Sequence, residues 1–108
     1  MTQQNTVDNS PLTESTLIAS PANLYAYLDS LFDQDVDADT LFASGYLRGF
    51  ISLAATEFGD ENQLITNTLV DTISKKLKQG KSELSPQDAA IVDNFWLKLQ
   101  TYFIYSNN

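Results

Sequence analysis

Apolar side chains recur every three or four residues through most of this chain, a spacing that places them on one face of an α-helix. The clearest stripe follows Ser85 and consists of Val92, Phe95, Trp96, Leu99, Tyr102 and Phe103. Another repeats in steps of four through Ile65, Leu69, Ile73 and Leu77. We find no alternating pattern typical of half-buried strands. The spacing predicts an all-α fold, an antiparallel bundle of four main helices with a polar N-terminal tail.

Capping residues set the expected helix boundaries. Serine precedes proline at 20–21 and at 85–86, which places a good cap before a proline at the first helical position. Asp37 or Asp39 is expected to cap the second helix. Two glycines that follow apolar runs are expected to end helices, namely Gly59 and Gly80. The expected helices are 21–32, 38–58, 61–79 and 86–103.

Composition predicts one domain. Hydrophobic residues make up 43% and charged residues 19% of 108 residues, which suits a folded chain with one modest core. Residues 1–20 are rich in Thr, Ser, Asn and Gln. We therefore expect 1–20 to form a polar N-terminal extension and 21–108 a single helical domain. Its core is expected to contain Phe42, Phe95 and Trp96.

The charge and the missing residue types exclude several functions. The chain has no cysteine and no histidine, which removes thiolate and imidazole catalysis and the usual metal ligands. Six basic against fourteen acidic residues argues against nucleic-acid binding. Ten of the acids and one base lie in residues 1–61, so the net charge of −8 belongs to the N-terminal half. We expect no cofactor and no catalytic residue.

Two observations bear on location. Residues 1–47 contain no Lys or Arg, which argues against a secretory signal with a basic n-region. The most apolar stretch, 41–58, includes Arg48 and Glu57 and is too polar to span a membrane. The sequence therefore predicts a cytoplasmic protein with no membrane contact.

A run of five aspartates leads into the second helix: Asp29, Asp33, Asp35, Asp37 and Asp39. The alternation that begins at Asp33 copies the opening of a calcium loop, but the sixth and twelfth positions hold Ala38 and Ser44 in place of glycine and glutamate. We therefore assign no metal site there. The main interpretation is an interhelical loop that caps the second helix, and the alternatives are weak divalent-cation binding and an acidic recognition surface at Asp33, Asp35, Asp37 and Asp39.

The second helix has two contrasting faces on a helical wheel. One is lined by small residues around an arginine, and its candidate binding residues, with a neighbouring tyrosine, are Ser44, Gly45, Tyr46, Arg48, Gly49 and Ser52. The other is expected to face the core through Phe42, Tyr46, Leu47, Phe50, Ile51, Leu53 and Phe58. Two glycines one turn apart weaken a helix, so they need a reason. Either they allow a neighbouring helix to approach while Arg48 pairs with the aspartate run, or they form the floor of a groove that presents Arg48 to an anion or to a partner's carboxylate.

The last helix carries a smaller apolar patch away from its main stripe. Leu97, Thr101 and Ile104 fall there, as ordinary surface residues or as a self-association face.

The run Leu41–Gly49, LFASGYLRG, resembles the signature of the YfcL family of small bacterial proteins. A second similarity is Glu83-Leu84-Ser85-Pro86 with Asp88, followed by Trp96. The resemblance covers about residues 24–102 and implies a small bacterial protein without an assigned activity.

Scarce reactive groups, an acidic surface and a small-residue face favour a non-enzymatic protein-interaction or accessory module with an unknown protein partner. The alternative is a small-ligand or anion-binding protein that uses a groove around Arg48 and Tyr46. An enzyme would have to rely on carboxylates with Arg48 for charge stabilisation.

Overall fold

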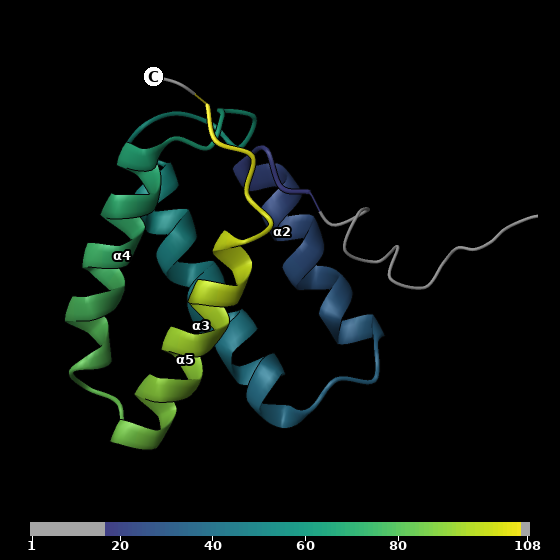
Figure 1. Ribbon diagram of the computed structural model, residues 1–108, viewed down its shortest axis with the longest axis vertical. Coiled ribbons are helices and arrows are strands. Elements are labelled where there is room, and N and C mark those ends of the chain that lie inside the picture. The colour runs from purple at the N-terminus through teal and green to yellow at the C-terminus, as the bar shows by residue number, and fades with distance from the viewer. Residues whose placement is uncertain (1–16, 107–108) are drawn as a thin grey trace, which may run out of the picture.

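The computed structural model describes residues 17–106 and confirms the all-α prediction (Figure 1). Consecutive helices run in opposite directions, and α5 lies in front of α3 in the view of Figure 1. In the described part the elements are α2 (Pro21–Ser30), the short 3₁₀ helix η2 (Leu31–Asp33), α3 (Ala38–Ala55), α4 (Asn67–Lys81) and α5 (Pro86–Gln100).

Each helix begins at a side-chain cap. The hydroxyl of Ser20 accepts a hydrogen bond from the backbone N–H of Asn23, and that of Ser85 accepts one from the backbone N–H of Asp88. The carboxylate of Asp37 accepts one from the backbone N–H of Thr40. These three predicted caps are confirmed. The cap of α4 is Thr66, which the sequence did not single out.

The helix α3 packs against α2, α4 and α5. Its buried face consists mainly of small residues, Ala43, Ser44, Leu47, Ile51, Ala54 and Ala55. Small side chains let three neighbours approach one helix closely. The prediction that the large residues of this helix face the core is correct for Leu47 and Ile51. It is wrong for Phe42, Leu53 and Phe58, which are exposed because the small residues occupy the interface. Phe32, expected on the buried face of the first helix, is also exposed.

The core lies between α3 and α5 and extends to α2 and α4. Trp96 and Phe95 lie in it as predicted, whereas Phe42 does not. The indole N–H of Trp96 donates to the hydroxyl of Ser74 on α4 at 2.9 Å. This bond satisfies the one polar group of a buried tryptophan.

Three distant segments close one end of the bundle. The backbone of Ile18 donates to Tyr102 at 2.9 Å and accepts from Ile104 at 2.8 Å, and Ser106 donates to Ile65 at 2.7 Å. Ile18 is buried, although it lies within the expected extension 1–20. The rest of that extension, up to residue 16, is outside the described residues.

Several helix boundaries differ from the prediction. The helix predicted over 61–79 is α4, and it begins at Asn67 because the backbone of Ile65 takes part in the contacts just described. It continues through Gly80, which lies inside the helix beneath the ring of Phe50. The helix predicted over 38–58 is α3, and it ends at Ala55. The side-chain amide of Gln63 donates a hydrogen bond of 2.8 Å to the backbone carbonyl of Ala55 at this end.

Candidate functional site

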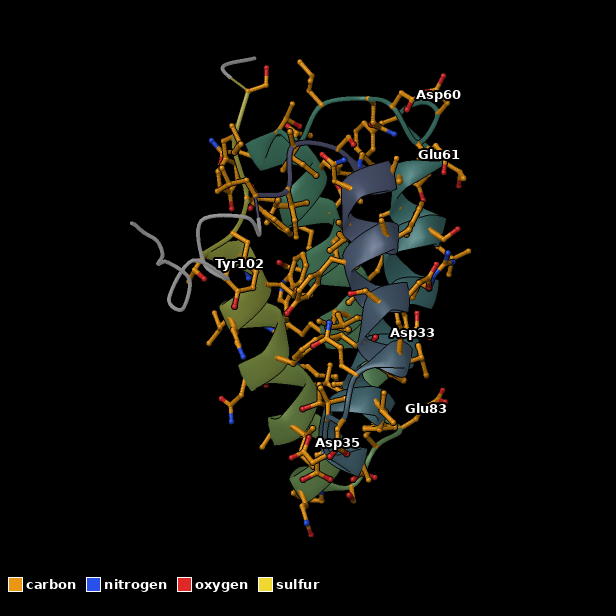
Figure 2. All side chains as sticks on the ribbon, turned by 90° about the vertical axis from the view of Figure 1, so that its right-hand side faces the viewer. Asp33, Asp35, Asp60, Glu61, Glu83 and Tyr102 are labelled. Atoms are coloured by element: carbon orange, nitrogen blue, oxygen red, sulfur yellow. The ribbon has the colours of Figure 1, made fainter. Side chains whose placement is uncertain are left out.

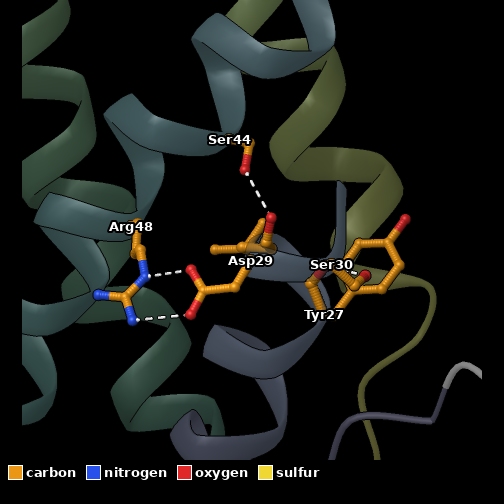
Figure 3. A network of polar contacts seen from close by, with 6 residues as sticks. Tyr27, Asp29, Ser30, Ser44 and Arg48 are labelled. Carbon is orange, nitrogen blue, oxygen red and sulfur yellow. Dashed lines mark hydrogen bonds and ion pairs between the residues drawn. The ribbon is translucent and has the colours of Figure 1, made fainter. Parts of the chain in front are cut away.

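Arg48 binds Asp29 with two parallel hydrogen bonds between α3 and α2 (Figure 3). Its Nε lies 2.9 Å from Asp29 Oδ1 and its Nη2 lies 3.2 Å from Oδ2. The pairing of Arg48 with an aspartate was one of the two interpretations of this residue. The partner, Asp29, is the first aspartate of the run described above and lies on α2.

The surroundings of this pair fix the guanidinium in place. Its Cζ lies 4.7 Å from the centre of the Tyr25 ring, a cation–π contact. The hydrogen bonds that Arg48 donates to Asp29 raise the pKa of the Arg48 guanidinium above its ordinary value. The side chains of Arg48 and Asp29 remain 42% and 57% exposed. Arg48 is thus oriented and charged, and Asp29 occupies the Nε–Nη2 edge of its guanidinium.

The candidate residues around Arg48 do not form one surface. Ser44 is fully buried, and its hydroxyl donates to the carbonyl of Leu28 at 3.4 Å (Figure 3). Gly45 and Gly49 are exposed, and no atom lies within 4 Å of a Cβ built at either one. The expectation that a neighbouring helix approaches these glycines is therefore wrong within residues 17–106.

A row of aromatic side chains runs beside the glycines. The ring centres of Phe42 and Tyr46 are 5.8 Å apart, and those of Tyr46 and Phe50 are 5.0 Å apart. Phe50 packs against Gly80 of α4, so this row is anchored at one end. Burial and the nearby charge of Glu83 raise the pKa of the Tyr46 hydroxyl, which stays protonated at neutral pH.

These residues make up a surface that we call the outer face of α3, defined as Phe42, Gly45, Tyr46, Gly49 and Leu53. Phe42 is 36% exposed and Leu53 is 61% exposed. The sequence prediction placed both in the core and so missed them as surface residues. A signal was present in Ala43, Ala54 and Ala55, whose spacing marks an alternative buried face.

The other four aspartates of the run are exposed around the start of α3. Asp37 is occupied as the helix cap, and its bonds to Thr40 lower the pKa of its carboxyl. Within residues 17–106 no group of three or more acidic side chains is arranged to hold a metal ion. The structure leaves Asp33, Asp35 and Asp39 as a solvated acidic surface.

Two hollows lie away from Arg48. One, of about 280 Å³, lies between α3 and α5 and is lined by Asp39, Thr40, Ala43, Ile91, Asn94, Phe95 and Lys98. The other, of about 420 Å³, lies beside the loop after α3 and is lined by Phe58, Gln63, Leu64, Thr66 and Thr68. Neither includes the candidate binding residues of α3.

The small apolar patch of the last helix is on the surface. Leu97 is 62% exposed, Ile104 is 47% exposed and Thr101 is exposed as well. Self-association through these residues stays a prediction. A separate observation concerns membranes: of the helices in residues 17–106, none combines the length and apolar character needed to cross a bilayer.

Comparison with known proteins finds one family. The family model described as YfcL protein matches residues 21–101. The uncharacterized protein YfcL of Escherichia coli (strain K12) is 38% identical over 80 residues, which cover 72% of this chain and 86% of that protein. No solved structure gives a significant match. The match spans α2 to α5 and includes the Leu41–Gly49 run, and the chain therefore belongs to the YfcL family.

Proposed function

We propose that this protein is a non-enzymatic protein-interaction module that docks a partner on the outer face of α3. The observation that supports this proposal is the exposure of Phe42 and Leu53 around two open glycines on one helix. Large apolar side chains that gather on one face, unlike scattered ones, are typical of interaction sites. Aromatic anchors also dominate the energy of many protein interfaces.

The glycines give this face a defined shape. Along α3 the row Leu41, Gly45, Gly49 and Leu53 lies beside a row of aromatic side chains, Phe42, Tyr46 and Phe50. On its other side the one large side chain is that of Arg48, between Ser44 and Ser52. Because neither glycine has a side chain or a covering neighbour, the middle of the row is a depression. Ridges of one helix pack into such depressions of another.

The alternative, an anion site at Arg48, has weaker support. The two bonds to Asp29 already occupy the Nε–Nη2 edge of the guanidinium, one of the two edges that can bind a carboxylate or phosphate with paired hydrogen bonds. An anion would have to bind the remaining N–H groups of Arg48, beside the negative charge of Asp29. Arg48 therefore fits better as a contact between α2 and α3 beside the docking surface than as its main ligand.

Site-specific photocrosslinking in the native cell tests the proposal. A benzophenone amino acid replaces Leu53 in one variant and Leu97 in another, two positions of nearly equal exposure on different helices. We expect position 53 to give a discrete adduct with a second protein, and Gly49→Gln in the same chain to abolish it by filling the depression. No adduct from position 53, or one that survives Gly49→Gln, would contradict docking on this face.

Position 97 is the matched control and has its own outcome. An adduct of twice the chain mass from that position alone would favour self-association through Leu97, Thr101 and Ile104 over docking on α3.

A further inference from the structure

We propose that the partner's docking segment is a basic amphipathic helix that lies along the outer face of α3. This inference rests on the proposed function and adds the chemistry of the partner. It is carried by the distribution of charge around an apolar surface, because complementary charge selects the partner while apolar contacts hold it.

The cations that border the outer face are already paired. Arg48 binds Asp29 on the α2 side, and Lys76 binds Glu57 at 2.8 Å on the α4 side. Among residues 17–106 the third ion pair joins Lys81, at the end of α4, to Asp93 on α5. The two neighbouring cations therefore add little free positive charge to the docking surface.

Unpaired carboxylates lie at both ends of this helix (Figure 2). Asp33, Asp35 and Asp39 surround its beginning, and Figure 2 shows Glu83 at the same end of the bundle. Asp60 and Glu61 lie at the opposite end. In the described part of the chain none of these carboxylates forms an ion pair. A partner with cations toward both ends of its docking segment matches this pattern.

The length of α3 sets the expected spacing. Its 18 residues span about 27 Å, so a partner helix that reaches both acidic ends has about 18 residues. Its apolar stripe would lie over Phe42 and Leu53, with small contacts at Gly45 and Gly49. A helix suits this surface better than an extended strand. The depression at Gly45 and Gly49 can receive a ridge of helical side chains, whereas the backbone groups of α3 are already hydrogen-bonded within the helix and cannot pair with a strand.

Other occupants fit less well. An anionic lipid surface would be repelled by the acidic ends, since such membranes attract basic segments. A second copy of this chain offers no exposed basic amphipathic helix in residues 17–106: the lysines of α4 share a helix whose apolar face is already in the core. The segment is therefore expected to come from a different protein.

The experiment uses three synthetic peptides of about 18 residues and the full chain, with binding followed by fluorescence anisotropy. The first peptide carries a leucine and alanine stripe with lysines toward both ends. The second has glutamate in place of every lysine, and the third keeps the lysines but scrambles the stripe. We expect the first to bind at least about tenfold more tightly than either control, and to lose about tenfold in affinity between about 50 and 500 mM salt.

Variants of the protein separate the apolar and the charged contributions. Phe42→Ser/Leu53→Ser and, separately, Gly49→Gln are each expected to weaken the first peptide about tenfold. Asp35→Asn is expected to weaken it about two- to fivefold, whereas Asp71→Asn, which removes the same charge from an exposed site on α4, leaves the affinity unchanged. Circular dichroism establishes that each variant is folded.

Three results would contradict a basic amphipathic helix as the partner. These are an equal affinity for the glutamate peptide, an affinity for the first peptide that Phe42→Ser/Leu53→Ser leaves unchanged, and no binding of any peptide. If the photocrosslink at position 53 nevertheless forms, the docking surface stands and only the basic helix is wrong. If the crosslink is absent as well, the docking surface itself is wrong.

Discussion

The ring of Phe50 on α3 occupies the space where a side chain on Gly80 of α4 would begin. A Cβ built on Gly80 overlaps the Cζ of Phe50 and lies 3.1 Å from the hydroxyl of Tyr46. Glycine in the interior of a helix costs about 1 kcal/mol relative to alanine, so its presence in α4 needs a compensating contact. The aromatic row of α3 supplies that contact.

The three helical glycines should therefore respond differently to alanine. Gly45→Ala and Gly49→Ala meet no atom within 4 Å, and each should raise the free energy of unfolding by about 0.5–1 kcal/mol. Gly80→Ala gains the same propensity but overpacks Phe50 at a cost of about 1–3 kcal/mol, so it should not stabilise the protein. Urea unfolding of the three variants measures the difference.

A double-mutant cycle provides the control for Gly80. In a Phe50→Ala background the obstructing ring is gone, and Gly80→Ala should then become stabilising by about 0.5–1 kcal/mol. An equal effect of Gly80→Ala with and without the Phe50 ring would show that the two residues are not coupled.

The ion pair of Arg48 with Asp29 should contribute little to stability. Both side chains are exposed, so Arg48→Ala is expected to lower the free energy of unfolding by no more than about 1 kcal/mol despite the two-pronged geometry. Arg48→Lys keeps the charge but loses one of the two parallel bonds, so its free energy of unfolding should lie between those of wild type and Arg48→Ala. Thermal unfolding at low and high salt checks this, because screening should shrink the difference. A loss of several kcal/mol would instead indicate that Asp29 is left in a dehydrated site.

The helices and their starts were predictable because the signals are local. Serine, aspartate and proline act within one turn, and the caps at Ser20, Asp37 and Ser85 lie where these residue types place them. The start of α4 was not predictable in this way. Ile65 continues the four-residue spacing of Leu69 and Ile73, but its backbone pairs with Ala19 and Ser106, which are distant in sequence.

The orientation of α3 was mispredicted for a related reason. Its wheel has one face of large and one of mainly small residues, and hydrophobicity alone favours burying the large ones. The helix contacts three others, which selects Ala43, Ala54 and Ala55 for the interface. Phe42 and Leu53 are thereby left on the surface. The candidate site thus depended on tertiary packing, whereas the pairing of Arg48 with an aspartate followed from charge alone.

Asp37 should make stability depend on acid pH. The hydroxyl and backbone N–H of Thr40 bond to its carboxylate and lower its pKa below the ordinary value of 3.8. A lowered pKa in the folded state means a contribution that is present above about pH 3.8 and is lost as the pH falls further, through the folded-state pKa. Asparagine caps helices nearly as well but does not titrate in this range.

We therefore expect wild type and Asp37→Asn to have different pH profiles. The stability of wild type relative to Asp37→Asn should fall as the pH is lowered below about 3.8 and be constant above pH 5. Thermal unfolding over this range measures it, with Asp35→Asn as an exposed control that has no capping role. Parallel profiles for wild type and Asp37→Asn would contradict the capping bond as the source of the shift.

Ser74, which is half-buried on α4, should be sensitive to substitution because of its contact with the core. Its hydroxyl accepts the N–H of Trp96, which is buried, so Ser74→Ala leaves that donor without a partner. An unsatisfied buried donor costs about 1–3 kcal/mol, and urea unfolding should show a loss of this size. Ser74→Thr retains an acceptor and should cost less. Ser82→Ala, which removes an exposed hydroxyl bonded to Gln79, is the surface control. Trp96 is the single tryptophan, so its fluorescence reports on this site, and an emission unchanged by Ser74→Ala together with unchanged stability would show that the bond to Ser74 does not form in solution.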